Sequence, residues 1–442
     1  MARLATGSGN VPPPATLSRI THSDMLSISR CPSVSSIPPR LTPARLAWLA
    51  LVALVGPTLL AAETTAPDNT APGASAPSAI PAPAARTSFG QDHKHVRPPE
   101  PPAETEAEAD PAAGEDDGPP RFPPRDATGQ QSYPKLQLNG LIEAGWVYTK
   151  PYAGPSEDEG IISTLDLVMT FQPHPWVKVQ ASGLYQDNGR APLELDVAQL
   201  RVGPPEGTWF VDGGQFYLPF GRYDSSMVSD PLTLELGETR EIGGGLGFAL
   251  DPFFGAAYAF EGEQHEGGGQ SSNAWGLEVG FAGQVGAHSL TLALGYLSDL
   301  GDSDRLREVV EDGDRVGGLA ASLLFEAGSW TLIGEYVTAT ERFNLGAGET
   351  LAEQQPSAWM LEAGYGFDLF RKPAQIALGY QGSAEALALE LPAARWLATF
   401  NLAIYDYTTV QLEYVHDQDY GASEGGTGDS GNGLTAQVAI AF

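Results

Sequence analysis

The chain has 442 residues, and its 55 aspartates and glutamates outnumber 24 lysines and arginines, giving a net charge of −31. A mean hydropathy of −0.16, with only one long apolar run, excludes a polytopic helical membrane protein, which needs repeated runs of about 20 apolar residues. The acidic balance argues against nucleic-acid binding. The single cysteine, Cys31, excludes a disulfide framework and a cysteine-based zinc site.

Residues 1–62 contain the features of a secretory signal peptide. An apolar run at 46–60 follows Arg40 and Arg45 and precedes small residues. The run is too short to span a membrane comfortably, so an uncleaved anchor is the weaker alternative. The stretch before the run is longer than a signal needs, and we expect an overlong n-region.

Residues 63–133 are dominated by alanine, proline and acidic residues. Such a stretch has few large apolar side chains to bury, so we expect a disordered linker in the periplasm. His93 and His95 lie within it and are interpreted as solvated, with no metal role. Proline-rich segments also act as spacers, which leaves open a structural role for the tract as a periplasmic tether.

Residues 134–442 follow a period-two pattern that predicts an all-β fold. In the last segment, 434–442, Leu434, Val438 and Phe442 share one face while Thr435 and Gln437 share the other. Alternation over about ten residues, repeated along a secreted chain, is typical of a transmembrane antiparallel β-barrel in the outer membrane. We count about 16 strands, an even number that closes the sheet.

The connections between these strands alternate between two lengths. Short periplasmic turns and longer outer loops are typical of such barrels, with both ends of the barrel domain in the periplasm. The short connections are at 173–175, 203–207, 251–252, 285–287, 327–329, 370–373 and 404–407. The longer ones are at 150–158, 187–192, 217–241, 263–272, 299–312, 343–355, 382–392 and 419–431.

Aromatic residues near the short turns predict one interfacial girdle, comprising Trp176, Trp209, Phe253, Trp330, Phe370 and Phe442. The terminal Phe442 resembles the signal that the outer-membrane barrel assembly machinery reads, so that machinery and outer-membrane lipid are expected partners. A soluble β-sandwich or propeller is the alternative fold, but neither requires the asymmetry of loop lengths. Localisation in the outer membrane of a Gram-negative-type cell follows from the barrel.

If the apolar face meets lipid, the polar face lines a lumen. The inward residues predicted by alternation include Glu143, Asp166, Lys178, Glu194, Asp196, Glu335, Glu362, Arg395 and Glu413. The barrel segment holds 42 acidic residues against 14 basic ones, and most of the acids are expected only to keep the loops solvated. Because charged rings inside a pore set ion selectivity, we expect a preference for cations.

The connection 217–241 is the longest and is rich in apolar residues, so it must pack against something. We expect it to fold inward and narrow the pore, and the alternative is a loop lying over the rim. Its acids are then expected to face Arg201, Arg222, Arg240 or Arg395. The candidate constriction residues are Gln215, Pro219, Phe220, Gly221, Arg222, Asp224, Asp230, Glu235, Glu238 and Arg240.

The run 211–221, VDGGQFYLPFG, and the run 227–239, MVSDPLTLELGET, resemble the motifs of the LbtU-type siderophore porins. The resemblance implies an outer-membrane β-barrel channel that takes up iron–siderophore complexes by passive or facilitated diffusion. It carries no established binding residues, so Gln215, Pro219, Phe220 and the other matched positions are motif positions. Many siderophores are polycarboxylates, which an acidic pore repels, so the cargo would be neutral, cationic or locally compensated.

Other functions are weighed against the channel. A general, cation-preferring small-solute porin fits the same residues. An enzyme barrel would need a reactive cluster at the rim, and only His416, Glu413 and Asp417, with Ser423 nearby, come close; we expect no catalysis.

No cofactor or metal is expected. Gly-rich runs at 243–245 and 267–269 lack the strand–helix context of a phosphate loop, and 302–314 lacks the spacing of a calcium loop. Sixteen-stranded porins commonly form homotrimers, but the sequence carries no signal for a subunit interface.

Overall fold

The computed structural model describes residues 133–186, 193–262, 271–310, 315–346 and 352–442. The expected signal peptide and nearly all of the expected linker lie outside these residues, as does the connection 187–192. The account that follows concerns the β-barrel alone.

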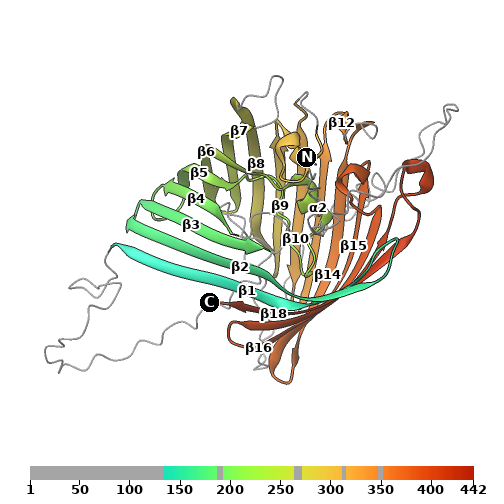
Figure 1. Ribbon diagram of the computed structural model, residues 1–442. Helices are drawn as coiled ribbons and strands as arrows, with labels where there is room; N and C mark the ends of the chain where they lie inside the picture. The colour runs from blue at the N-terminus through green and yellow to red at the C-terminus, as the bar shows by residue number, and fades with distance from the viewer. Residues whose placement is uncertain (1–132, 187–192, 263–270, 311–314, 347–351) are drawn as a thin grey trace, which may run out of the picture. The chain divides into compact units, whose positions relative to one another are not determined.

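Sixteen antiparallel strands close into one barrel, confirming the predicted fold class and strand count (Figure 1). Each strand pairs with its neighbours in chain order, and β1 pairs with β18 to close the ring. The strands are β1 Lys135–Lys150, β2 Glu157–His174, β3 Val177–Gln186, β4 Glu194–Val202, β5 Trp209–Tyr217, β6 Arg240–Leu250, β7 Phe253–Gly262, β8 Ser271–Val285, β9 His288–Leu297, β10 Gly318–Ala327, β11 Trp330–Ala339, β14 Ser357–Leu369, β15 Lys372–Ala384, β16 Ala394–Tyr405, β17 Thr408–Gln418 and β18 Ser430–Ala441.

The closing seam extends to the last residue of the chain. The backbone N–H of Phe442 donates to the carbonyl of Gly140 at 2.9 Å, and the N–H of Gly140 donates back at 2.8 Å. The Phe442 ring lies over Gly140: a Cβ on residue 140 would be 2.4 Å from the ring Cζ, so a larger residue there would displace the ring. Phe442 therefore completes the β1–β18 pairing, whatever else reads it.

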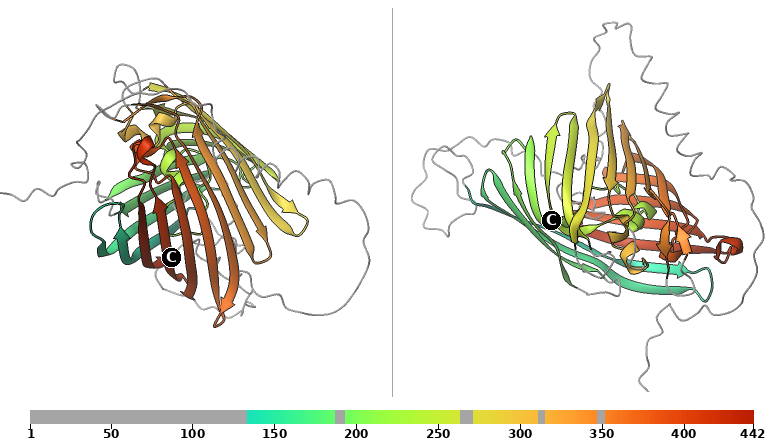
Figure 2. Two further views of the ribbon diagram at one scale, coloured as in Figure 1. Left: turned by 90° about the vertical axis from the view of Figure 1, so that its right-hand side faces the viewer. Right: turned by 90° about the horizontal axis from the view of Figure 1, so that it is seen from above.

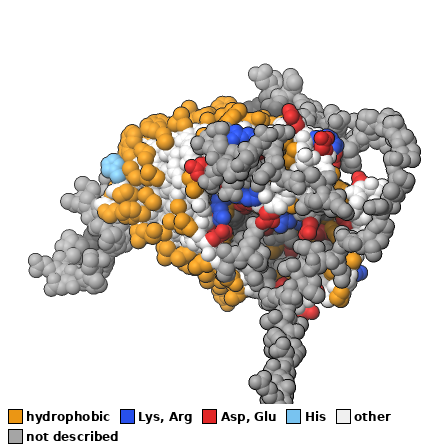
Figure 3. Space-filling view, turned by 45° about the horizontal axis from the view of Figure 1, so that its top comes forward, with side chains coloured by type: hydrophobic (Ala, Val, Ile, Leu, Met, Phe, Trp, Pro, Cys, Tyr) orange, Lys and Arg blue, Asp and Glu red, His pale blue; other side chains and the backbone are white. Residues whose placement is uncertain are grey.

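Large apolar side chains cover the outer side of the strands. On β2, Leu165, Leu167 and Met169 are exposed, whereas Asp166 between them points inward and is buried. This is the period of two expected when one face meets lipid and the other lines the lumen. Figure 3 shows hydrophobic side chains gathered on the outer side, with acidic and basic side chains gathered toward the interior.

Two aromatic girdles flank the apolar band, one more than the sequence indicated. The girdle at the short turns contains the ring pairs Trp176–Trp209, Phe253–Phe281 and Trp330–Tyr365. The girdle at the opposite end contains Trp275–Tyr296, Trp359–Tyr380 and Tyr380–Trp396. Aromatic rings at both edges of an apolar band mark the two interfaces of a membrane-spanning barrel.

Short and long connections alternate as predicted. The turns between β6 and β7, between β10 and β11 and between β14 and β15 each leave two residues outside the strands. In the last of these, Phe370 and Arg371 both have positive φ, 52° and 64°, the conformation of a type I′ hairpin turn.

The long connections contain short helices and one small hairpin. These elements are α2 Leu232–Gly237, η2 Leu300–Asp302, η3 Leu306–Glu308, β12 Phe343–Leu345 paired with β13 Ala352–Gln354, η5 Leu387–Leu389 and η6 Ala422–Glu424. Viewed from above, α2 lies inside the ring of strands (Figure 2). In the described part of the chain, no helix is long and apolar enough to cross a membrane.

Candidate functional site

The connection between β5 and β6, residues 218–239, lies inside the barrel and is here called the constriction segment. Its two ends meet, because the N–H of Leu218 donates to the carbonyl of Thr239 at 2.9 Å. Gly221 adopts φ +76° and turns the chain toward the wall. Helix α2 follows directly after Pro231, which is suited to a helix start because it needs no N–H partner there.

Apolar side chains anchor the segment in a packed core. Phe220 is 1% exposed, and Leu232 and Leu236 are 0% exposed. They join apolar residues from the other long connections and the wall, including Leu297, Leu300, Leu306, Val316, Val337, Phe343, Leu345, Ala386, Leu389 and Leu391. Each buried Leu or Phe contributes about 2 kcal/mol, so this packing alone favours an ordered position inside the lumen.

Glu335 on β11 is the first of three wall carboxylates that hold the backbone of the segment. Its Oε1 accepts hydrogen bonds from the N–H of Arg222 at 2.6 Å and of Tyr223 at 3.2 Å. Its Oε2 accepts one from the hydroxyl of Thr233 at 2.8 Å. A buried carboxylate is tolerated only when such donors surround it, so the segment and Glu335 require each other.

Glu362 on β14 and Glu413 on β17 repeat the arrangement further along the segment. Glu362 accepts from the hydroxyl of Ser225 and the N–H of Ser226, both at 2.8 Å. Glu413 accepts from the N–H of Val228 at 2.5 Å and of Ser229 at 2.8 Å. The three carboxylates thus bind donors at steps of about three residues, which lays 222–229 along the inner wall.

Ion pairs fix the charged residues of the segment. Arg222 pairs with Asp224 at 2.9 Å, both nearly fully buried, and Glu235 pairs with Arg305 of the connection between β9 and β10 at 3.3 Å. The N–H of Asp304 donates to the carbonyl of Glu238 at 2.8 Å. The described residues 298–310 of the connection between β9 and β10 therefore pack onto the constriction segment, a contact that the sequence did not indicate.

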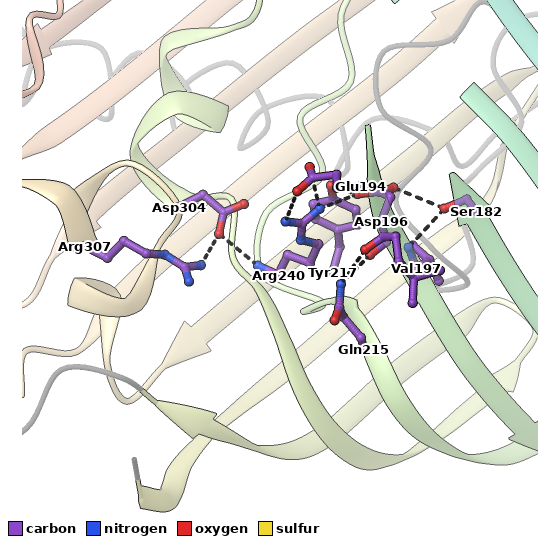
Figure 4. A network of polar contacts seen from close by, with 10 residues as sticks. Ser182, Glu194, Asp196, Val197, Gln215, Tyr217, Arg240, Asp304 and Arg307 are labelled. Carbon is purple, nitrogen blue, oxygen red and sulfur yellow. Dashed lines mark hydrogen bonds and ion pairs between the residues drawn. The ribbon is translucent and has the colours of Figure 1, made fainter. Parts of the chain in front are cut away.

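A network around Arg240 joins the base of the segment to β3 and β4 (Figure 4). The Arg240 Nη1 contacts Glu194 Oε1 at 3.0 Å and Asp196 Oδ1 at 2.8 Å. Asp196 also accepts from the hydroxyl of Tyr217 at 2.6 Å. The Nε2 of Gln215 donates to the carbonyl of Leu195 at 2.9 Å, which gives this motif residue a structural contact.

Basic residues elsewhere on the wall are also paired. Arg201 forms two 2.6 Å hydrogen bonds to Asp212 and lies over the Phe210 ring, and Lys178 is its cross-strand neighbour. Arg395 pairs with Asp417 at 2.7 Å. The side chains of Arg201, Arg240 and Arg395 thus form ion pairs with wall carboxylates. Of the acids in the connection, Asp224 pairs with Arg222, and Glu235 acts electrostatically on Arg395.

The other sequence-predicted residues lie on the inner wall or in the constriction segment. Glu143, Asp166 and Lys178 lie on the inner wall of β1, β2 and β3, and Asp230 is an exposed residue of the segment. Pro219 accepts a hydrogen bond from the Tyr258 hydroxyl at 3.0 Å. Glu335, Glu362 and Glu413 point inward as predicted, but they are buried beneath the segment, so they do not present a charged ring to water.

Burial sets the ionisation of one segment residue. It raises the pKa of the Tyr223 hydroxyl well above its ordinary value, with Glu335 adding to the shift. Tyr223 therefore stays neutral and acts as a packing residue.

The region weighed for catalysis contains ordinary contacts. His416 Nδ1 lies 2.9 Å from Asn432 Oδ1, and Ser423 is an exposed residue of η6. Among the described residues, no group of three or more His, Cys, Asp or Glu side chains is placed to hold a metal ion.

The architecture is that of the outer-membrane porins. The outer-membrane channel DcaP of Acinetobacter baumannii superposes with a TM-score of 0.52 at 14% identity, covering 72% of this chain and 99% of DcaP. An anion-selective porin from Comamonas acidovorans gives 0.51 at 13%, covering 70% and 100%. Salmonella typhi OmpF, in a complex with daunomycin, gives 0.52 at 14%, covering 70% and 98%. At these identities the likeness concerns the fold alone.

The relatives in sequence are UPF0422 proteins. One from Legionella pneumophila strain Philadelphia 1 is 28% identical over 370 residues, covering 70% of this chain and 67% of the relative. One from Coxiella burnetii strain RSA 493 is 27% identical over 344 residues, covering 70% and 72%. No family model matches the chain. The resemblance to LbtU-type siderophore porins therefore still rests on the motif alone.

Proposed function

We propose that this protein is a porin-like channel that lets small solutes diffuse across the outer membrane through a narrowed lumen. The observation that carries the proposal is the constriction segment, which three wall carboxylates and a packed apolar core hold inside a closed barrel. A barrel serving only as a structural anchor gains nothing from an ordered narrowing of this kind.

Charge supports a preference for cations. The constriction segment, 218–239, carries four acidic residues and one basic residue, Arg222, so its own net charge is negative. On the neighbouring wall, Arg201, Arg240 and Arg395 are ion-paired with carboxylates of the wall. Carboxylates beside a narrow aqueous path raise the local concentration of cations.

Iron–siderophore complexes are the cargo that the motif resemblance suggests. The motif residues have structural contacts. The Gln215 amide donates a hydrogen bond and the Pro219 carbonyl accepts one, while Phe220 is buried and Gly221 forms a turn. The motif residues thus explain how the constriction segment is held in place. They do not identify the cargo, which we infer from the charge of the lumen. A neutral or cationic complex fits an acidic lumen better than a polycarboxylate does.

Single-channel recording of the full-length protein in a planar bilayer tests the proposal. We expect steady conductance and a reversal potential under a KCl gradient that shows preference for potassium. A properly folded barrel that does not conduct would contradict the channel. Iron–siderophore complexes of different charge are then added to one side, and concentration-dependent block by neutral or cationic complexes only would support that cargo.

The same proposal extends to the surroundings of the barrel. The tract 63–133 would lie in the periplasm, Phe442 would be read by the barrel assembly machinery, and the assembly would be a homotrimer. Protease protection in intact cells, deletion of Phe442 and cross-linking in native membranes test these three expectations separately.

A further inference from the structure

Strand β4 contains a β-bulge, in which Asp196 and Val197 together lie opposite Ser182 of β3. The Ser182 hydroxyl serves both residues of the bulge. It accepts a hydrogen bond from the N–H of Val197 at 3.0 Å and donates one to Asp196 Oδ2 at 3.3 Å. A bulge inserts one extra residue into a strand, so it changes which residues of the strand face each side of the sheet.

The bulge keeps the acidic end of β4 inside the lumen. After the bulge, Arg201 is buried on the inner side and Leu200 is 45% exposed on the outer side. Before it, Asp196 lies on the inner side and Leu195 is 58% exposed on the outer side. In a regular strand an odd spacing puts two side chains on opposite faces, so Asp196 and Arg201 could not both point inward. Loss of the bulge would turn Glu194 and Asp196 toward lipid.

Gln215 of β5 supports the bulge from the outer side of the wall. It lies opposite Ala198, and this is the last pair in the register of β4 with β5. Beyond this pair, Gln215 Nε2 donates to the carbonyls of Leu195 at 2.9 Å and Asp196 at 3.0 Å. Val211, on the same face of β5, is 47% exposed on the outer side. A side-chain amide thus holds the stretch of β4 that the backbone ladder leaves.

The amide of Gln215 satisfies polar groups that lipid cannot. An amide in apolar surroundings is costly unless its N–H groups are bonded, and a backbone carbonyl in the membrane needs a donor from the protein. The amide and the two bulge carbonyls meet these needs together. Gly214 makes the contact possible: its φ is +128°, and a Cβ there would be 2.1 Å from the carbonyl oxygen of Ala198. A larger residue would prevent this close approach of β5 to β4.

On the inner side, the bulge brings Asp196 to the base of the constriction segment (Figure 4). Arg240 Nη1 lies 2.8 Å from Asp196 Oδ1 and 3.0 Å from Glu194 Oε1. The side chains of Arg240 and Glu194 are 21% and 38% exposed, so these charges are accessible from the lumen. Two carboxylates against one guanidinium make the charge of this group negative.

We propose that Gln215 is a positioning residue for ion selectivity: from the lipid side of the wall, it fixes the bulge that holds Glu194 and Asp196 in the lumen. This inference rests on the proposed channel function and adds a residue that determines its selectivity. Gln215 does not touch the permeating ion. It acts through Asp196, because its contacts lie on the backbone that orients this carboxylate. The competing interpretation is that Gln215 only stabilises the wall.

The test compares the ion selectivity of full-length variants in planar bilayers. Gln215→Leu removes the amide donors and keeps the outer face apolar. Val211→Leu is the matched control, because it puts the same side chain on the same face of β5 away from the bulge. Asp196→Asn removes the carboxylate that Gln215 positions, and it is combined with Gln215→Leu in a double-mutant cycle. Reversal potentials under a KCl gradient give the potassium-to-chloride permeability ratio, and unfolding in urea gives the stability.

We expect Gln215→Leu to lower the potassium-to-chloride permeability ratio about twofold, since carboxylate charge leaves the lumen while Arg240 stays. Val211→Leu should leave the ratio unchanged. In the Asp196→Asn background, Gln215→Leu should have a smaller effect, because both changes act on one carboxylate. An unchanged ratio with a loss of stability would show that Gln215 only stabilises the wall. An equal fall in both backgrounds would overturn the action through Asp196.

Thiol labelling measures the bulge without reference to transport. In a Cys31→Ser background, Leu195→Cys should resist a membrane-impermeant thiol reagent, and adding Gln215→Leu should make it react, because residue 195 then turns toward the lumen. If Gln215→Leu does not assemble, Ser182→Ala removes the other support of the bulge and should have the same effect. Resistance in every assembled variant, or labelling of Leu195→Cys alone, would overturn the proposal.

The two measurements separate this inference from the proposed function. A folded barrel with no KCl current would overturn the channel and the selectivity role of Gln215 with it, whatever the labelling shows. A conducting channel whose permeability ratio does not respond to Gln215→Leu would overturn the selectivity role and leave the channel standing.

Discussion

The two sides of the lumen differ in what surrounds their inward polar residues. On β11, β14 and β17 the inward glutamates lie under the constriction segment and bind its backbone. On β1–β3 the inward residues Gln137, Asn139, Glu143 and Gln180 are exposed or half-buried. The first group is here called the covered side and the second the open side.

The difference shows that burial decides the role of inward-facing polar residues, even though the period-two alternation places all of them on the same face of the sheet. Apolar residues of the long connections form a core against the covered side, which removes water from the carboxylates there. A buried carboxylate must then be satisfied by protein donors. On the open side, Gln137, Asn139, Glu143 and Gln180 keep part of their surface accessible, although Asp166 on the same face of β2 is buried.

Removing Glu335 should have the largest effect. In Glu335→Ala, the N–H groups of Arg222 and Tyr223 and the Thr233 hydroxyl lose their acceptor, at a cost of about 3 kcal/mol. The segment should detach, and trypsin should cleave the folded barrel after Arg222. Cleavage is followed by mass spectrometry, and unfolding is followed in urea. Glu335→Gln keeps one acceptor and should be cleaved less; equal resistance of all three proteins would show that the apolar core suffices.

Gly221→Ala should have the next largest effect. Its φ of +76° is strained for alanine, and the new Cβ would lie 2.6 Å from the Cζ of the buried Tyr223 ring. We expect a loss of about 2 kcal/mol in the free energy of unfolding. The matched control is Gly154→Ala, where φ is +100° but nothing lies within 4 Å. If both variants lose equally, the cost is backbone strain, and contact with Tyr223 contributes nothing.

On the open side, Glu143→Gln should change selectivity while stability stays nearly constant. Its carboxylate accepts from Gln437 at 2.8 Å, a contact that a glutamine can retain. The reversal potential under a KCl gradient should move toward zero because one lumen charge is lost. A stability loss as large as that of Glu335→Gln would contradict the distinction between the two sides.

The local pattern of the sequence was sufficient for the strands and turns. Period-two alternation depends on neighbouring residues only, so it predicts β18 and the short connection at 370–373 equally well; in the structure only 370 and 371 lie outside the strands. The aromatic girdle that contains Trp330 was also predictable from the sequence, because its aromatic residues lie beside the short turns. The second girdle was missed, since Trp359, Tyr380 and Trp396 meet only through strand register.

The site was only partly predictable for a related reason. The length and apolar content of 217–241 favoured an inward fold. They did not indicate which strands of the wall the segment would contact. That choice depends on contacts between distant connections, such as Leu236 with Leu306 and Leu389 in one core. Glu143 and Glu335 have the same place in the alternation, so the sequence does not distinguish the water-facing glutamate from the buried one.

Acid should open one outer connection, which is the smallest expected effect. The Asp419 carboxylate accepts hydrogen bonds from the hydroxyl and N–H of Thr427, both at 2.7 Å, and from the N–H of Tyr420 at 2.8 Å. Burial alone would raise the pKa of Asp419, but these hydrogen bonds outweigh burial and hold the pKa below its ordinary value. A lowered folded-state pKa stabilises the connection above about pH 4, the unfolded value, and this stabilisation is lost as the pH falls through the folded value. Hydrogen exchange at Thr427, corrected for the intrinsic rate, should therefore speed up in acid, while exchange at Leu218, whose N–H donates to the backbone carbonyl of Thr239, should not. In Asp419→Asn the exchange should be faster at neutral pH and independent of this titration; an unchanged acid response would assign the effect to another group.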